Sequence, residues 1–357
     1  MSRMGQANAH PEYLARRSFG SLDGLRALSI LGVLFHHCGG STSGGVWARG
    51  HLGVDLFFVI SGFLIVTLLL RERMHTGTVS LRAFYARRSL RILPLYYGVL
   101  LVTWLATLPS ESAGARTYRE GLPWALLYLT NWHVVQGMLS CTWSLAAEEQ
   151  FYLAWPWLQK HGGRLALPVL VLLLATCVGL QLTHALHGVP AGLPDFLQQA
   201  SFTPILLGVA LAHLLHHAPA HAGMARILGT AAAAPICLAT LCTAVLWPSD
   251  DIDGPQRLLV HLAMTALVAS CVLREDHGLA GMLRFRPLAT VGVLSYGIYM
   301  LHGFAMHLSA ALLDPPRTGL APAHLALSTV LATALAWASY RWFESPFLRL
   351  KQRFARG

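Results

Sequence analysis

Apolar stretches long enough to cross a bilayer recur along the whole chain, with short polar segments between them. A transmembrane helix needs about 20 consecutive, mostly apolar residues. The pattern of hydrophobic and polar positions places such helices over residues 22–40, 52–70, 90–108, 143–158, 165–186, 202–217, 227–247, 257–273, 287–313 and 322–343. The predicted fold is therefore all-α, a polytopic membrane bundle of about ten transmembrane helices.

Composition and charge support a membrane protein and predict its orientation. Of the 357 residues, 55% are hydrophobic and 12% are charged, whereas a soluble domain carries about 25% charged residues. The formal net charge is +10, and with the N-terminus inside, most Lys and Arg residues fall in cytoplasmic segments, as the positive-inside rule requires. We therefore expect an integral protein of the cytoplasmic (inner or plasma) membrane with both termini cytoplasmic and no nucleic-acid partner.

This topology divides the chain into three regions. Residues 1–21 are polar and basic without a signal-peptide pattern, so we expect a cytoplasmic segment. Residues 22–345 form the membrane domain, and residues 346–357 form a basic cytoplasmic tail. Residues 121–135 are apolar enough to cross, but one more crossing would move many downstream basic residues outside. We interpret them as an outer-leaflet or re-entrant piece.

The first predicted span carries polar residues at two depths. The eleven residue steps from Arg26 to His37 make three full helical turns plus about 20°. The two side chains therefore share one face of the helix and lie about 16 Å apart along its axis. His36 is turned by about 80° from Arg26. Because an arginine at mid-bilayer costs roughly 2.5 to 3.5 kcal/mol on insertion scales, this face indicates a polar cavity with His37 as a candidate base. Two unrelated residues, one snorkelling and one packed, are the alternative.

Carboxylates occur in two later spans. Asp55 lies about one turn below the outer end of the second span, level with His37, where it could hold the imidazole in one tautomer. A helix N-terminal cap explains Asp55 equally well. Glu148 and Glu149 lie in the upper part of the fourth span, and at least one should meet a cation or a polar cavity.

Basic residues gather at the inner end of the third span. Arg87, Arg88 and Arg91 precede Pro94, which would kink the helix. Guanidinium groups suit phosphates, so the sequence predicts a phosphate site in which Arg87 and Arg91 share a face. Ordinary positive-inside anchoring is the alternative.

A polar stripe marks the ninth span. Ser295, Tyr299 and His302 follow at offsets of four and three, which places them on one helix face, and His302 lies at the depth estimated for His37. Three polar residues on one face favour the interpretation that they line a substrate-binding cavity. A single packed histidine is the alternative. Trp143 is a further candidate substrate contact, although a place in the interfacial aromatic belt explains it as well.

Cysteine and histidine patterns give little support for a disulfide or a metal site. The six cysteines show no CxxC spacing; Cys38 and Cys141 map near the outer face and could pair in an oxidising compartment. His213, His216 and His217 have metal-like spacing, but no carboxylate or cysteine accompanies them, so no metal is predicted.

Six segments occur together in the order of a known family. They read LDGLRALSILGVLFHH, GVDLFFVISGFLI, FYARRSLRILP, WSLAAEEQFYL, SYGIYMLH and FESPF, and they resemble the acyltransferase-3 family of integral-membrane O-acyltransferases. The resemblance places the family's motif residues on Arg26, His37, Arg87, Arg88, Arg91, Glu148, Ser295, Tyr296 and His302. Unlike many relatives, no extracytoplasmic hydrolase-like domain is expected after the last span.

The resemblance implies an O-acyltransferase, most simply an acetyltransferase, that uses acetyl-CoA or another acyl-CoA from the cytoplasm. The acceptor would be a hydroxyl of a glycan, a lipid-linked sugar or a related molecule, reached beside membrane lipid. His37 would act as general base or carry the acyl group briefly, and Asp55 or Glu148 would orient it. The basic motif would hold the donor's phosphates. The acceptor and the acyl chain length stay open.

Two other function classes fit parts of the pattern. A transporter or flippase could line a path with intramembrane charges, but such proteins often carry internal repeats, and no motif here occurs twice. A non-catalytic membrane anchor has little reason to bury so many ionisable groups.

Overall fold

The computed structural model describes residues 9–16, 18–39, 49–133, 135–187, 202–247, 252, 254–313 and 321–354. Within these ranges every regular element is a helix, which confirms the predicted all-α class. Residues 1–8 of the predicted N-terminal segment and 355–357 of the predicted tail lie outside them.

The helices differ widely in length. The longer ones are α3 (Ser21–His37), α5 (Gly53–Thr76), α6 (Leu81–Thr107), α8 (Thr142–His161), α9 (Ala166–His187), α11 (Thr203–His216), α13 (Ala233–Leu246), α14 (Gly254–Leu273), α17 (Ser295–Leu313) and α18 (Pro322–Ala338). The shorter ones are α2 (Ala9–Ala15), α7 (Ala113–Leu126), α12 (Ala218–Leu228), α15 (Ala280–Leu283), α16 (Arg286–Val293) and α19 (Ser345–Lys351). Single turns occur at Gly50–Leu52, Gly137–Leu139, Gly163–Leu165 and Gln352–Phe354, and a π-helical segment, η5, at Ser339–Glu344.

The predicted number of ten spans is not confirmed. Five helices in the described part of the chain are long and apolar enough to cross a membrane, and two bent pairs raise the number to seven. The five cover Gly50–Thr76, Leu81–Thr107, Gly163–Thr183, Gly254–Leu273 and Pro322–Phe354. The predicted spans in α3 and α13 are only 17 and 14 residues long, and α8 carries two glutamates and a lysine.

Bends account for two further differences. The predicted continuous span at 287–313 is broken between α16 and α17, whose axes differ by 77°, and α11 turns into α12 by 107°. Such bends depend on tertiary contacts with other helices, and the hydrophobic periodicity of one segment gives no information about these contacts. The last helix also continues through the predicted boundary at residue 345.

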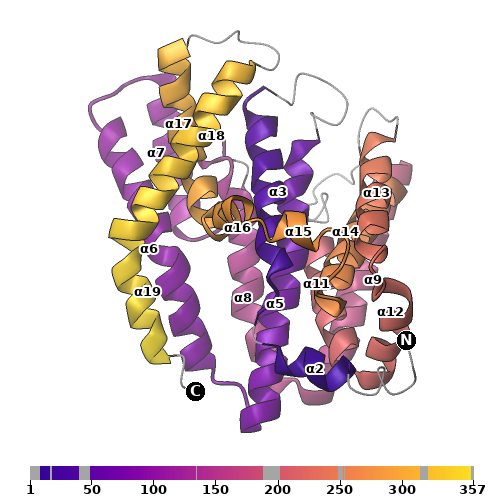
Figure 1. Ribbon diagram of the computed structural model, residues 1–357. Coiled ribbons are helices and arrows are strands. Elements are labelled where there is room, and N and C mark those ends of the chain that lie inside the picture. The colour runs from indigo at the N-terminus through magenta and orange to yellow at the C-terminus, as the bar shows by residue number, and fades with distance from the viewer. Residues whose placement is uncertain are drawn as a thin grey trace.

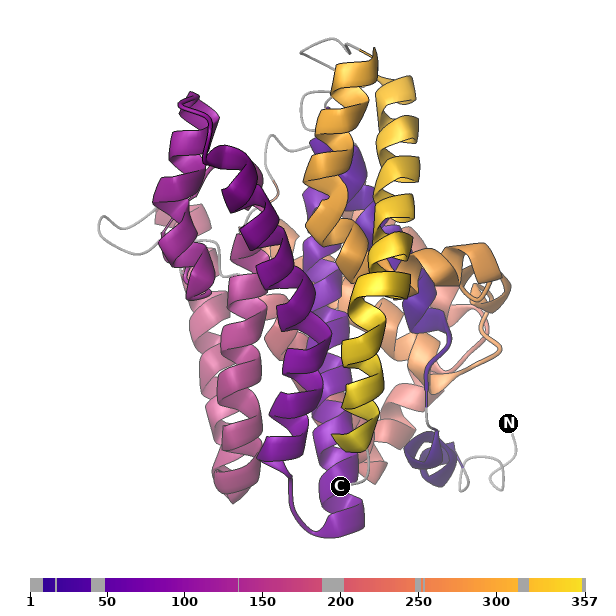
Figure 2. The same cartoon turned by 90° about the vertical axis from the view of Figure 1, so that its left-hand side faces the viewer.

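The long helices stand roughly upright, and three short ones lie across them (Figure 1). α16 and α15 cross α3 at mid-height, and α2 lies toward the lower end. Figure 2 shows α7 folded back along the upper part of α6 and the upright pair α17–α18 opposite them. The Tyr118 hydroxyl of α7 donates to the Leu100 carbonyl of α6, at 2.6 Å. The predicted piece at 121–135 thus begins in α7, which at 14 residues is too short to cross.

Glycines allow the closest helix contacts. A Cβ at Gly24 of α3 would lie 2.2 Å from the Leu283 carbonyl oxygen, and one at Gly292 of α16 would lie 1.8 Å from the Asp23 carbonyl oxygen. Small residues let membrane helices approach backbone to backbone. The α15–α16 segment is therefore seated directly on α3 and fixes its depth relative to α17.

The pair α5–α11 uses the same device. A Cβ at Gly62 would lie 2.1 Å from the Ile205 carbonyl oxygen, and one at Gly208 would lie 2.2 Å from the Val59 carbonyl oxygen. Each helix thus presents a glycine to the other's backbone, and neither backbone can yield as a flexible side chain would.

We predict that Gly208→Ala lowers the free energy of unfolding by about 1–3 kcal/mol, because the added methyl group forces the two backbones apart. Thermal unfolding of the detergent-purified protein measures the change. Gly179→Ala in α9 is the matched control, since nothing lies within 4 Å of a Cβ there. Equal stability of the two variants would contradict the packing described.

Candidate functional site

Two histidines from distant segments meet at the centre of the site. The Nδ1 atom of His37, at the end of α3, lies 2.9 Å from Nε2 of His302 in α17. The ring centroids are 4.9 Å apart and the ring planes differ by 9°. The two rings are thus nearly parallel, and the distance between the nitrogen atoms is that of a hydrogen bond. The structure thus brings together two residues that the sequence placed at one depth.

A carbonyl group determines which nitrogens carry protons. His302 Nδ1 lies 2.5 Å from the Tyr299 carbonyl oxygen, and because a carbonyl can only accept, this nitrogen donates. In a neutral His302 the Nε2 atom is then an acceptor, so His37 Nδ1 must donate to it. The Nε2 atom of His37 is left with a free lone pair, as a general base requires.

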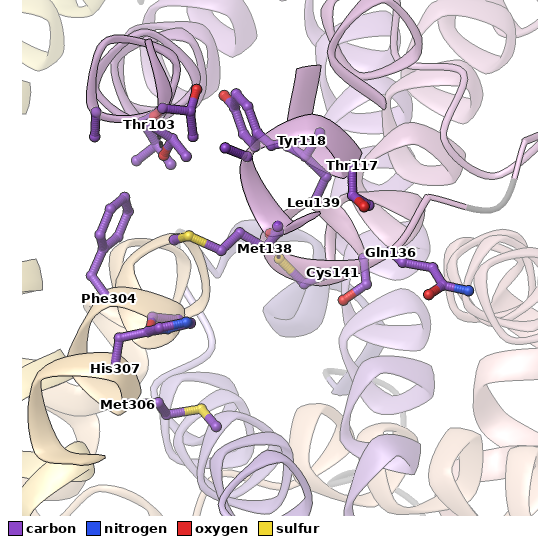
Figure 3. Close-up of a pocket in the computed structure, with 18 of the residues that line it drawn as sticks. Thr103, Thr117, Tyr118, Gln136, Met138, Leu139, Cys141, Phe304, Met306 and His307 are labelled. Atoms are coloured by element: carbon purple, nitrogen blue, oxygen red, sulfur yellow. Dashed lines mark hydrogen bonds between the residues drawn. The ribbon is translucent and has the colours of Figure 1, made fainter. Parts of the chain in front are cut away.

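Both histidines line a large cavity of about 890 Å³, here called the histidine cavity. Its walls come from the upper part of α6, from α7, from the segment before α8 and from α17. In Figure 3, Tyr118 lies on one side and Phe304 and His307 on the other, with Met138 reaching between them. The space is large enough for a small-molecule ligand, because such pockets commonly measure about 300–1,000 Å³.

A second, smaller cavity of about 90 Å³ is lined by three arginines, and we call it the arginine cavity. Arg26 comes from α3, and Arg88 and Arg91 come from α6. Glu148, Ser295, Tyr296 and Tyr299 also line it. The shared face predicted for Arg26 and His37 therefore meets two cavities, one at each residue.

Tyr299 links the linings of these two cavities. It lines the arginine cavity, and its hydroxyl lies 2.7 Å from Ser144 Oγ and 2.7 Å from the Cys141 carbonyl oxygen. Cys141 in turn lines the histidine cavity. One turn farther along α17, His302 faces the histidine cavity.

Arg88 is held by a buried ionic cluster. It lies 3.5 Å from Glu148 and 3.9 Å from Glu149, and its guanidinium carbon is 3.7 Å from the centre of the Tyr152 ring. The Tyr152 hydroxyl also donates to Glu148. A buried guanidinium is stable only when it is paired in this way, so Arg88 has a structural part whatever else it does.

The other two arginines of the basic motif differ from each other. Arg87 donates to the Phe354 carbonyl at 2.7 Å and pairs with Glu72 at 3.4 Å, and it does not line the arginine cavity. α6 thus presents Arg88 and Arg91 to the arginine cavity, while Arg87 contacts Glu72 and Phe354. A phosphate-binding role for Arg87 stays a prediction. Within the described ranges Arg91 forms no hydrogen bond or ion pair, but it shares a small pocket with the Glu344 carboxylate, whose charge acts on it.

The expected orienting carboxylates lie elsewhere. Asp55 is 2% exposed, and its Oδ2 lies 3.0 Å from His261 Nε2 and 3.5 Å from Arg257. Glu148 pairs with Arg88 in the arginine cavity. The expectation that either one holds the His37 imidazole is corrected: that position belongs to His302. Hydrophobic periodicity did not fix the rotation of α5, which turns Asp55 toward α14.

The remaining candidates have simpler surroundings. Trp143 packs edge-to-face on Phe58, with ring centroids 6.2 Å apart, and it lines neither cavity. Cys38 and Cys141 are free thiols. In the part of the chain that the structure describes, no group of His, Cys, Asp or Glu side chains is arranged to hold a metal ion.

Sequence reasoning missed two features of the site. The polar stripe of α17 pointed to a cavity, but nothing in the sequence paired His302 with His37 rather than with a carboxylate. The sequence does not identify Ser144 as a site residue, because a single serine in an apolar helix forms no recognisable pattern. Its place in the site follows only from its contact with the Tyr299 hydroxyl.

Comparison with known proteins decides the family. The family described as an acyltransferase domain matches residues 19–341, nearly the whole chain. The chain belongs to this family. With at least five helices able to span a membrane in its described part, the acyltransferase is an integral membrane protein.

Two bacterial relatives are similar over almost the full length of the acyltransferase. "Putative peptidoglycan O-acetyltransferase YrhL" of Bacillus subtilis is 29% identical over 352 residues, which is 91% of this chain and 54% of that protein. "Peptidoglycan O-acetyltransferase OatA" of Listeria monocytogenes is 27% identical over 364 residues, which is 93% of this chain and 56% of that protein. The acyltransferase thus spans about half the length of these relatives. No solved structure matches it.

Proposed function

We propose that this chain is a membrane O-acetyltransferase that moves an acetyl group from cytoplasmic acetyl-CoA to a hydroxyl of a cell-envelope glycan. The observation that carries the proposal is the chain of hydrogen bonds from the Tyr299 carbonyl through His302 to His37. It leaves a basic nitrogen facing a ligand-sized cavity. The names of the relatives, which specify peptidoglycan, support a carbohydrate acceptor.

The arginine cavity is the proposed donor side. Three arginines against one glutamate give its lining a net positive charge, which favours the phosphates of a coenzyme. Arg91 is the proposed phosphate contact because it lines the arginine cavity and forms no hydrogen bond or ion pair in the described ranges. Arg88 is occupied by Glu148 and Glu149, and Arg87 ties α6 to the end of the chain.

The proposed chemical step is a direct transfer at His37. Its Nε2 removes the proton from the acceptor hydroxyl as that oxygen attacks the thioester carbonyl carbon. The new C–O bond forms, the C–S bond breaks, and the departing thiolate of coenzyme A takes the proton from His37. Tyr299 is the proposed barrier between the two cavities, so the thioester reaches His37 only when the hydroxyl of Tyr299 releases Ser144.

His302 acts in this scheme as a positioning residue. It fixes the tautomer and the ring orientation of His37, the part that a carboxylate has in many hydrolases. A neutral imidazole in this position accepts the hydrogen bond from the Nδ1–H group of His37 without adding a buried charge. A buried charge is costly in a membrane.

We predict that His37→Ala lowers the rate of acetyl transfer by about 10²–10⁴-fold, the contribution of a general base. The reconstituted full-length protein, assayed for labelled acetyl groups on envelope glycan, measures the rate. His36→Ala is the control, because the His36 ring packs against both His51 and His37 but does not line the histidine cavity, and the variant should keep activity within a few-fold. Normal turnover in His37→Ala would exclude this mechanism.

A second prediction concerns His302. His302→Ala should lower kcat by about 10–100-fold, the usual cost of losing an orienting partner, with the KM for acetyl-CoA little changed. His302→Gln should recover part of the activity that His302→Ala loses, because an amide oxygen can also accept the hydrogen bond from the Nδ1–H group of His37. If glutamine rescued no better than alanine, the hydrogen bond would have no catalytic value.

A third prediction tests the donor side. Arg91→Ala should raise the KM for acetyl-CoA about tenfold or more, the value of one hydrogen bond to a charged group, while the protein stays folded because no direct hydrogen bond or ion pair within the described ranges is lost. Arg82→Ala removes the same charge from an exposed position on α6 and should leave the KM unchanged. Equal effects would point to general electrostatics rather than to a contact.

A further inference from the structure

The two cavities differ in the charge of their walls. The arginine cavity has four charged side chains among its lining residues. The histidine cavity, about ten times as large, has no Asp, Glu, Lys or Arg among the described residues that line it. Its polar groups belong to serine, threonine, glutamine, tyrosine and histidine, none of which carries a permanent charge.

Charged residues are present nearby but are used in other contacts. Arg119 of α7 donates to the carbonyl groups of Thr107 and Ser110, at 2.8 and 3.0 Å, and lies 3.5 Å from Glu111. These bonds close the turn between α6 and α7. Neither Arg119 nor Glu120, on the same helix, lines the histidine cavity.

Large apolar side chains complete the walls. Leu100, Met138, Phe304 and Met306 line the cavity between the hydroxyl groups, and Met138 reaches between α7 and α17 (Figure 3). Its Cε would lie 3.7 Å from a Cβ at Gly303. Sugar rings combine hydroxyl edges with apolar faces, and this mixture matches them. An isolated charge placed in such a space would lose hydration without gaining a partner.

We infer that the histidine cavity admits an uncharged, hydroxyl-bearing acceptor and discriminates against acceptors that bring a phosphate or carboxylate into it. This inference rests on the proposed function and specifies its acceptor. The part of the acceptor that enters is a neutral sugar unit. The phosphate end of a lipid-linked or nucleotide-linked sugar stays outside the cavity.

The test uses the full-length protein in vesicles, with acetyl-CoA and two acceptors that differ in one group: N,N′-diacetylchitobiose and its 1-phosphate. The neutral disaccharide should be acetylated with a kcat/KM about tenfold higher or more, because only the phosphate must be desolvated without a partner. Equal kcat/KM values for the two would overturn the inference while leaving the proposed acetyltransferase intact. No acetylation of either would reject both proposals.

A matched pair of variants assigns the discrimination to this cavity. Met138→Lys places a cation where the methionine reaches across the space, and Met138→Gln changes polarity without charge. The preference for the neutral acceptor should fall several-fold in Met138→Lys relative to Met138→Gln, because the ammonium group pairs with the phosphate. An identical preference in the two variants would show that the selection is made elsewhere and would overturn the inference.

Discussion

The close approach of α3 to the α15–α16 segment is the constraint on which the site depends. Gly24 and Gly292 let the two backbones touch, and this contact determines how far α3 rises beside α17. The level of His37 against His302 follows from it, and so does the place of Arg26 in the arginine cavity. A side chain larger than hydrogen at either glycine would shift α3 and separate groups that meet only at 2.9 Å.

Much of this arrangement could be predicted from residue spacing, but not the partners. Helical periodicity placed Arg26 and His37 on one face and Ser295, Tyr299 and His302 on another, because these relations lie within single helices. The predicted number of ten spans is not confirmed, and one reason is that tertiary contacts bend helices, as at α16–α17. The partners of Asp55 and Arg87 could not be predicted for a related reason: which neighbour a side chain meets depends on the rotation of its helix, and that is set by packing with residues far away in sequence.

Charge is distributed so that the membrane interior holds few isolated ions. Asp55 is matched by His261 and Arg257, and Arg88 by two glutamates and a tyrosine ring. His37, the proposed catalytic base, is instead hydrogen-bonded to a second imidazole, which needs no counter-ion. Arg91 differs from its neighbours on α6, because in the part of the chain that the structure describes it shares a pocket with Glu344 without forming a direct ion pair.

The bonds of the Tyr299 hydroxyl to Ser144 and Cys141 have a consequence for the host cell. If the two cavities open to opposite sides of an energised membrane, as the proposed function requires, a continuous file of water through them would dissipate the proton gradient. The Tyr299 phenol group, bonded to Ser144 and Cys141, would then be the barrier between them. If the barrier moves only as an acetyl group passes, the enzyme can connect two compartments chemically while remaining electrically tight.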